Sequence, residues 1–354
     1  MKIAINGFGR IGRNVCRALI ERALFDDIEI VAINDVADAH TLVHLLNFDS
    51  TYGRLTNIGV TARIESNDEG QVLQLIASSP DILASKKEQI IAKIAILDEK
   101  NPENLPWGAL EVDVVLECSG QFRSYKRANI HRLAGAKQVV IGAAPFDEVD
   151  ACVVVGVNDA QLSLDLPIIS GVSCTTQALV PLIATLDAAF GVDSAMMTEI
   201  HAVTADQNVL DQAHRDLRRA RASGYNIIPT TSSSIAATER VLPNMAGRIN
   251  GYSMRVPTID VAAIDVTFNF LKQVTLADVK NILQQASEKQ LSGIMGYTTK
   301  PLVSSDFVHQ RESLIVDDFQ LLQVGKQVKV FAWYDNEWGY ANRLVDMCMV
   351  LKNK

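Results

Sequence analysis

A glycine-rich turn near the start of the chain constrains the fold most strongly. An apolar run at 2–6 leads into the turn 7–12, which reads Gly-Phe-Gly-Arg-Ile-Gly, and helical spacing of apolar side chains follows at 11–23. In this setting the first glycine permits a tight turn, the second lets backbone approach a pyrophosphate, and the third lets helix and strand pack closely. The helix N-terminus offers N–H groups to phosphates. With a further strand at 28–34, the segment predicts a dinucleotide-binding βαβ unit.

The residue that ends the second strand indicates which dinucleotide is bound. Asp35 stands where a carboxylate accepts hydrogen bonds from ribose hydroxyls and repels a 2′-phosphate, which favours NAD over NADP. Arg10 lies inside the turn, and it either binds phosphate or starts the helix as a solvated side chain.

The remaining chain divides into two parts of different pattern. Before residue 173, strands and helices alternate, with strands expected at 112–118, 137–142 and 151–155 and a helix near 125–135. This alternation predicts a parallel sheet with both faces covered. Beyond it we expect a helix at 175–188 and then period-2 strands at 194–204, 250–256, 259–271 and 327–334. The stretch 205–248 is polar and poor in periodicity, which predicts a long functional loop.

These patterns predict an α/β chain of two domains. A Rossmann domain is expected over 1–173, with a C-terminal helix at 340–354 returning to it. An α+β domain with a mixed or antiparallel sheet is expected over 174–339.

Composition narrows the classes of partner and compartment. The 354 residues carry a net charge of -8, which argues against a protein that binds nucleic acid or an anionic membrane through bulk charge. The cysteines are odd in number and lack CxxC spacing; they are Cys16, Cys118, Cys152, Cys174 and Cys348. Neither a disulfide framework nor a metal site fits them, and no apolar run is long enough to span a bilayer. We therefore expect a cytoplasmic protein without a metal.

Cys174 is the candidate nucleophile. It lies at the start of the helix expected after Ser173, where the helix dipole stabilises a thiolate and is expected to lower the thiol pKa. His201 is its candidate base. The helix leads away for roughly 18–24 Å at about 1.5 Å per residue, and the strand returns over about 23 Å at about 3.3 Å per residue. These matched lengths predict that His201 ends beside Cys174.

Further along the chain, residues suited to anions follow the histidine. Thr204 and Asp206 come first, and the stretch 216–221 then carries three arginines in an otherwise acidic protein. Arg255 opens an Arg-Val-Pro-Thr sequence. Such a set indicates a phosphorylated substrate.

Six motifs in this order resemble the glyceraldehyde-3-phosphate dehydrogenase superfamily over essentially the whole chain. They are INGFGRIGRN at 5–14, SCTT at 173–176, DLRRARA at 216–222, IIPTT at 227–231, RVPT at 255–258 and WYDNEWGY at 333–340. The resemblance implies an NAD-dependent, glycolytic oxidation of a phosphorylated aldehyde through a cysteine thiohemiacetal and thioester, with inorganic phosphate as acyl acceptor. It also implies a homotetramer in which the stretch 205–225 lies against a neighbour's cofactor.

The resemblance also assigns roles to individual positions. Cys174 matches the acyl-forming nucleophile and His201 its base. The substrate's own phosphate would be bound by Thr204, Asp206, Arg219 and Arg255, and inorganic phosphate by Ser173, Thr175 and Ser232. The nucleotide would be bound by Gly7, Gly9, Arg10, Ile11, Gly12, Asp35, Ser119, Asn336 and Tyr340, among which Asn336 resembles the residue that holds the nicotinamide carboxamide.

Three departures keep alternatives open. The segment 171–178 lacks the family's usual second cysteine and has Gln177 in place of asparagine. Ser232-Ser233 replaces the usual Thr-Gly of the inorganic-phosphate pocket, so water is an alternative acyl acceptor. The stretch 211–214 departs from the Leu-Pro typical of strictly NAD-using members, which leaves NADP use open. Erythrose-4-phosphate dehydrogenases share nearly all the motifs and are the alternative enzyme; an NAD-binding interaction protein without catalysis is the alternative of another class.

Overall fold

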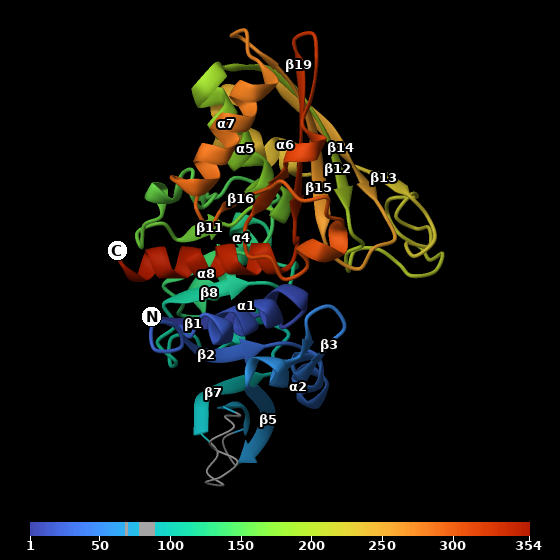
Figure 1. The fold of residues 1–354 in the computed structure, drawn as a ribbon. Coiled ribbons are helices and arrows are strands. Elements are labelled where there is room, and N and C mark those ends of the chain that lie inside the picture. Colours follow the sequence, from blue (N-terminus) through green and yellow to red (C-terminus); the bar gives the residue numbers. More distant parts are fainter. Residues whose placement is uncertain (68–69, 78–88) are drawn as a thin grey trace. The chain divides into compact units, whose positions relative to one another are not determined.

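The chain folds into two compact units (Figure 1). The structure is a computed structural model that describes residues 1–67, 70–77 and 89–354. Unit 1 comprises Met1–Ala151, Ala160–Gly171 and Leu344–Lys354, and unit 2 comprises Cys152–Asp159 and Val172–Arg343. The chain therefore passes between the units more than once, and the segment 152–159 belongs with the later part of the chain.

Unit 1 is built on a nine-stranded sheet, counted over the described residues, in the order β10-β11-β9-β8-β1-β2-β7-β6-β5. The pairings from β11 through β7 are parallel, and β6 and β5 add an antiparallel edge. The strands span Lys2–Asn6 (β1), Glu29–Asn34 (β2), Val60–Asn67 (β5), Gly70–Ala77 (β6), Gln89–Leu97 (β7), Val114–Glu117 (β8), Gln138–Ile141 (β9), Ala151–Cys152 (β10) and Ile168–Ser170 (β11). The strands expected at 2–6, 28–34, 112–118 and 137–142 are confirmed, and the strand expected at 151–155 is present only as the two residues of β10. No strand was expected from the sequence at β5, β6, β7 or β11.

Helices cover this sheet. Among its described residues, unit 1 has the helices α1 (Arg10–Glu21), α2 (Ala39–Asn47), α4 (Tyr125–Leu133) and the end of α8 (Trp338–Lys352). A small ribbon forms from β3 (Phe48–Asp49) and β4 (Gly53–Arg54). Every residue of β8 and β9 is buried. A strand buried at consecutive positions has both faces covered, as the apolar runs predict.

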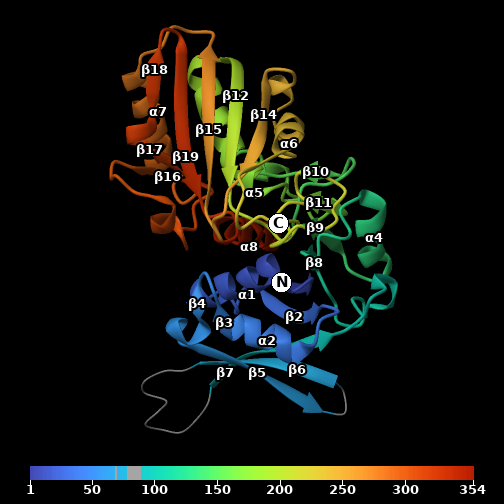
Figure 2. The same ribbon diagram turned by 90° about the vertical axis from the view of Figure 1, so that its right-hand side faces the viewer.

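The core of unit 2 is a mixed eight-stranded sheet, again counted over the described part of the chain. Figure 2 shows β14, β12, β15 and β19 side by side in that order. Strand β12 pairs in parallel with β14 and antiparallel with β15, which brings His201 opposite Arg255. The strands span Val192–His201 (β12), Ile228–Thr230 (β13), Ile249–Arg255 (β14), Ala262–Phe270 (β15), Met295–Thr298 (β16), Leu314–Asp317 (β17), Leu322–Val324 (β18) and Gln327–Tyr334 (β19).

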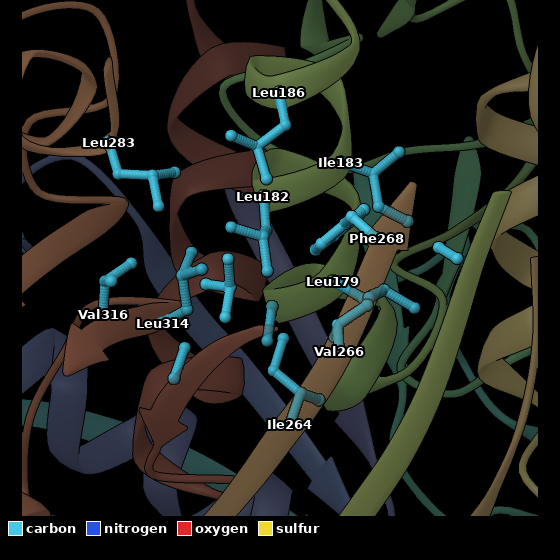
Figure 3. Packing of buried hydrophobic residues seen from close by; sticks show 14 of the residues in the cluster. Leu179, Leu182, Ile183, Leu186, Ile264, Val266, Phe268, Leu283, Leu314 and Val316 are labelled. Carbon is cyan, nitrogen blue, oxygen red and sulfur yellow. The ribbon is translucent and has the colours of Figure 1, made fainter. Parts of the chain in front are cut away.

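Three helices lie wholly within unit 2, namely α5 (Cys174–Phe190), α6 (Ser234–Val241) and α7 (Leu276–Glu288), and α8 begins there. Helix α5 lays Leu182 and Ile183 against Ile264 and Phe268 of β15, with Leu283 of α7 alongside (Figure 3). All five side chains are fully buried, and each such burial contributes about 1.5–3 kcal/mol. This packing fixes α5 on the sheet and so fixes the place of its first residue.

The stretch 205–248 is not a continuous loop, and this expectation is wrong in part. Irregular backbone runs to about residue 227, after which β13, α6 and the 3-10 turn Pro243–Met245 follow. The hydroxyl-rich start of α6 obscured its short pattern. Other 3-10 turns lie at Leu55–Ile58, Pro102–Asn104, Asp159–Gln161, Ser304–Phe307 and Asp318–Gln320. Within the described ranges, the structure has no helix with the length and apolar character needed to cross a membrane.

Candidate active site

Cys174 is the first residue of helix α5, and Ser173 caps that helix. The Ser173 hydroxyl accepts a hydrogen bond from the backbone N–H of Thr176 at 3.1 Å. Such a cap satisfies one of the N–H groups that a helix start leaves without a partner. The cap and the buried body of α5 hold the cysteine at a defined point, because the residue before it and the residues after it are both fixed.

The structure brings His201 to Cys174, as the helix and strand lengths predict. The distance from Cys174 Sγ to His201 Nε2 is 3.6 Å. The other ring nitrogen, Nδ1, lies 2.7 Å from the carbonyl oxygen of Ala202. A carbonyl only accepts, so Nδ1 carries the proton of the neutral ring and Nε2 presents a lone pair to the thiol. The pair is therefore arranged for proton transfer from sulfur to Nε2.

Glu199 and Tyr334 belong to the same cluster, and sequence reasoning missed both. Thr175 Oγ1 donates to Glu199 Oε1 at 2.7 Å, and Tyr334 Oη lies 2.8 Å from Thr175 Oγ1. Glu199 Oε1 is also 3.7 Å from His201 Nε2. Glu199 could have been found from the strand pattern, because residues two apart on a strand share a face and Glu199 precedes His201 by two.

Burial and Glu199 set the charge state of the pair. Burial first, and then the Glu199 carboxylate, raise the pKa of Cys174 to about 12. Burial first, and then Arg255, lower the pKa of His201 to about 4. The lowered thiol pKa expected from the helix dipole is thus wrong for the free protein, because loss of solvent outweighs the dipole. At neutral pH the resting pair is a thiol and a neutral imidazole.

Arginines lie near this pair, as expected. Arg255 is mostly buried at 9% exposure, its Nε lies 3.5 Å from Thr230 Oγ1, and its Nη1 has no hydrogen-bond partner among the described residues. Arg219 donates to Asp206 at 2.6 Å, so that carboxylate orients the guanidinium. A buried guanidinium nitrogen without a partner fits an anion from outside the chain.

The hydroxyls expected to bind phosphate have partners within the chain. Ser173 Oγ lies 2.7 Å from Thr176 Oγ1, and Ser232 Oγ lies 2.6 Å from Ser234 Oγ. Thr175 donates to Glu199, as described above. Thr204 is half-buried at the start of the irregular stretch after β12.

In unit 1, the glycine turn is shaped to admit a bound dinucleotide. Gly7 has a φ of +92°, and a Cβ there would lie 2.4 Å from the backbone nitrogen of Ser119. A Cβ at Gly12 would lie 2.3 Å from the carbonyl oxygen of Gly7, whereas at Gly9 it would meet no described atom within 4 Å. The first and third glycines are therefore required for packing, and the second faces open space at the start of α1, beside Ile11.

Backbone N–H groups hold the side chain of Asp35 in place. Its carboxylate accepts from the backbone N–H groups of Phe8 at 2.7 Å and Ala37 at 3.0 Å. A cavity of about 310 Å³ adjoins it and is lined by Asn6, Gly7, Asn34, Asp35, Val36, Glu99, Lys100, Pro102, Ser119, Gln121, Phe122 and Arg127. Arg10 pairs with Asp49 and lies over the ring of Tyr52, which favours a structural role for that arginine.

Asn336 and Tyr340 lie in unit 2. Asn336 is 5% exposed, and its Oδ1 has no partner within the described chain. Such a buried acceptor fits the NH₂ group of a carboxamide. The Tyr340 hydroxyl donates to the carbonyl oxygen of Val172 at 2.9 Å, which ties α8 to the segment before Cys174.

Comparisons with known proteins assign the chain to a family. Residues 1–125 match the family model "Glyceraldehyde 3-phosphate dehydrogenase, NAD binding domain", and residues 173–336 match its C-terminal domain. The chain is 42% identical to glyceraldehyde-3-phosphate dehydrogenase of Geobacillus stearothermophilus over 356 residues, which cover 100% of this chain and 99% of the relative. It is 43% identical to the Mycobacterium avium enzyme over 98% of this chain and 97% of the relative. It is 42% identical to the plasmid-encoded enzyme of Cupriavidus necator over 99% of this chain and 98% of the relative.

These matches span both units and include the glycine turn and the Cys174 segment. The chain is an NAD-dependent dehydrogenase, and it belongs to the glyceraldehyde-3-phosphate dehydrogenase family.

Proposed function

We propose that this enzyme oxidises glyceraldehyde 3-phosphate with NAD and inorganic phosphate to 1,3-bisphosphoglycerate, a step of glycolysis. The observation that carries the proposal is the 3.6 Å approach of His201 Nε2 to the thiol of Cys174, with the ring tautomer set by Ala202. The names of the relatives supply the substrate.

The first step is addition of the thiol to the aldehyde. The Cys174 sulfur forms a bond to the carbonyl carbon while its proton moves to His201 Nε2, and the carbonyl oxygen takes up that proton to give a neutral thiohemiacetal. The resting thiol holds its proton, so there is no preformed thiolate in the free protein. His201 therefore accepts the thiol proton as the sulfur attacks the aldehyde.

The second step is oxidation. NAD, when bound, supplies the hydride acceptor. As the C–H bond of the thiohemiacetal breaks, His201 Nε2 takes the hydroxyl proton, and a thioester on Cys174 remains. Attack of phosphate on that thioester then breaks the C–S bond and releases the acyl phosphate. The sulfur takes back the proton held on His201 Nε2, which restores the thiol and the neutral ring.

Arg255 and Arg219, with Thr204 and Asp206, form the pocket we propose for the phosphate of the aldehyde. The buried Nη1 of Arg255 supports this role, since it gains a partner when the anion binds. Asp206 acts through Arg219, whose guanidinium it holds at 2.6 Å.

We propose Ser173, Thr175 and Ser232 as the residues that bind inorganic phosphate. Each hydroxyl has a partner within the free chain, so the incoming phosphate must exchange with that partner. At Thr175 the partner is the Glu199 carboxylate, which makes this exchange the most demanding of the three.

The dinucleotide would be bound by the turn residues Gly7, Gly9, Ile11 and Gly12, by Asp35 and Ser119, and by Asn336 and Tyr340. Arg10, expected in this set, has a structural role instead, because its side chain pairs with Asp49. The open space at Gly9 and the fixed carboxylate of Asp35 support pyrophosphate and ribose binding. The acceptor oxygen of Asn336 supports its role with the carboxamide.

We further propose a cytoplasmic homotetramer that binds neither nucleic acid nor membranes. Exposed apolar side chains in the stretch 205–227 support burial against another copy; they are Val209, Leu210, Leu217, Tyr225 and Ile227. Exposed apolar side chains gathered on one segment are typical of interfaces.

A coenzyme-reduction assay tests the proposal. NADH formation is measured with glyceraldehyde 3-phosphate and with erythrose 4-phosphate, each with and without inorganic phosphate, and with NADP in place of NAD. We expect phosphate-dependent NADH formation with the triose. Faster turnover of the tetrose without phosphate would overturn the substrate and the acyl acceptor, and absence of turnover with both would overturn the enzyme assignment.

A further inference from the structure

Glu199 is a buried acid that the motifs of the site do not account for. It lies in the middle of unit 2 on β12, and it is 2% exposed. Its Oε2 has no hydrogen-bond partner among the described residues. A buried carboxylate with one oxygen lacking a hydrogen bond costs free energy of folding. A positive charge close to it would offset that cost.

A chain of hydrogen bonds aims this carboxylate at the histidine. Because Glu199 accepts from Thr175, the hydroxyl of Tyr334 must donate to Thr175 rather than accept from it. Burial and Glu199 raise the pKa of Tyr334, so its phenol keeps the proton that it donates. The result is a fixed carboxylate whose Oε1 lies 3.7 Å from His201 Nε2.

The other charged groups around His201 oppose a proton on its ring. Burial lowers the pKa of His201 most, and Arg255 of β14 and Arg219 of the irregular stretch lower it further. Cys174 of α5 and Tyr334 of β19 also face the ring, and both are neutral at physiological pH. Glu199 is the carboxylate that raises the pKa of His201.

We propose that Glu199 is a positioning residue that stabilises the imidazolium of His201 during oxidation of the thiohemiacetal. This inference rests on the proposed function. In that step the O–H bond breaks and its proton goes to Nε2, the C–H bond breaks and its hydride goes to NAD, and the C–O bond becomes the carbonyl of the thioester.

The charges present in each step indicate that Glu199 assists oxidation of the thiohemiacetal rather than deprotonation of the thiol. When the thiol gives its proton to His201, Glu199 favours the new imidazolium but disfavours the new thiolate, and the two effects largely cancel. In the thiohemiacetal the sulfur is bonded to carbon and carries no charge. The carboxylate then acts on the imidazolium alone, and at 3.7 Å in a buried site the attraction is strong.

Three variants test this role. Glu199→Gln removes the charge but retains an oxygen for the Thr175 hydroxyl, and Glu199→Asp retains the charge on a shorter side chain. Asp265→Asn is the matched control, since Asp265 lies on the neighbouring strand β15 and pairs with Lys329 away from the cluster. Turnover, stability in urea and alkylation of Cys174 by iodoacetamide are measured for each.

For Glu199→Gln we expect kcat to fall by about 10–100-fold with KM for the aldehyde nearly unchanged. This is less than the ~10²–10⁴-fold typical of losing a general acid or base, because Glu199 acts only through His201. The deuterium isotope effect from the aldehyde C–H should increase, because oxidation becomes slower. At alkaline pH alkylation should become faster, since a charge that raises the thiol pKa is gone. Stability should be equal or higher. Glu199→Asp should recover part of kcat, and Asp265→Asn should match wild type.

A fall in turnover together with faster alkylation in Glu199→Gln separates this role from a structural one, because structural damage would not accelerate the reaction of the thiol. A kcat of Glu199→Gln within twofold of wild type would overturn the inference, and so would joint losses of stability, turnover and alkylation in both Glu199 variants. If wild type itself oxidises neither aldehyde, the proposed function fails separately. The alkylation arm needs no substrate and still reports the effect of the Glu199 charge on Cys174.

Discussion

At the residue scale, the reactive pair combines features that the sequence could predict with one that it could not. The matched lengths of α5 and β12 predict that His201 meets Cys174. The charge state of the pair depends on burial and on Glu199. Glu199 lies in none of the sequence motifs. Motifs identify groups that touch ligands, whereas a carboxylate acting through another side chain is visible only once the packing is known.

Replacing His201 tests the base. We expect His201→Asn to lower kcat by about 10²–10⁴-fold, the usual effect of losing a general base. The thiol should also react more slowly with iodoacetamide at neutral pH, because the proton acceptor 3.6 Å away is lost. An alkylation rate equal to that of wild type would show that the two side chains do not interact.

Replacing Arg255 tests the pocket for the substrate phosphate. Arg255→Lys keeps the positive charge but loses the planar set of donors that binds phosphate through two oxygens. We expect KM for glyceraldehyde 3-phosphate to rise by about 10-fold or more, because the lysine loses one strong hydrogen bond to the phosphate. An unphosphorylated aldehyde should be affected little. Equal losses with both substrates would make Arg255 structural.

At the element scale, the βαβ turn was predictable in detail because each glycine has its own steric reason. The antiparallel edge formed by β5, β6 and β7 was not predicted, since its apolar alternation carries no motif and elements were expected from the sequence only before residue 35 and after residue 111. Helix α6 was missed for a related reason, because a short helix rich in Ser and Thr resembles a loop.

A pair of glycine substitutions separates the steric role of the turn from its role in binding. Gly7→Ala forces a Cβ to 2.4 Å from the Ser119 nitrogen at a positive φ, so we expect a loss of at least about 2 kcal/mol of stability. Gly9→Ala has room and should unfold at nearly the wild-type urea concentration, yet bind NAD more weakly. Equal NAD affinity in Gly9→Ala would move the pyrophosphate away from that residue.

At the scale of the whole molecule, the two sheet types were predictable from the change of pattern near residue 173. The course of the chain between units was not, because the placement of 152–159 with unit 2 depends on contacts rather than on local pattern. The energetics of unit 2 include a dependence on pH that sequence cannot show, because burial holds His201 neutral at pH values where the unfolded chain binds a proton.

That histidine predicts how global stability depends on pH. Its pKa is lowered from 6.5 to about 4, so the unfolded chain binds the proton first as the pH falls. Stability is therefore fully present above pH 6.5 and is lost as the pH falls towards 4, by a total of about 3 kcal/mol from this group. Urea unfolding of His201→Asn should show a shallower decline over this range than wild type. Parallel curves for the two proteins would contradict the lowered pKa.

Cys174→Ser tests the central claim, that a thioester on this residue carries the oxidation. A serine hydroxyl fits the same capped helix start but is a much weaker nucleophile, so NAD affinity should remain nearly that of wild type while NADH formation from glyceraldehyde 3-phosphate is abolished. Mass spectrometry of wild type mixed with substrate and NAD, without phosphate, should find the acyl group on Cys174. Activity of the serine variant above about a tenth of wild type would contradict the account, because loss of a catalytic nucleophile lowers kcat by several orders of magnitude.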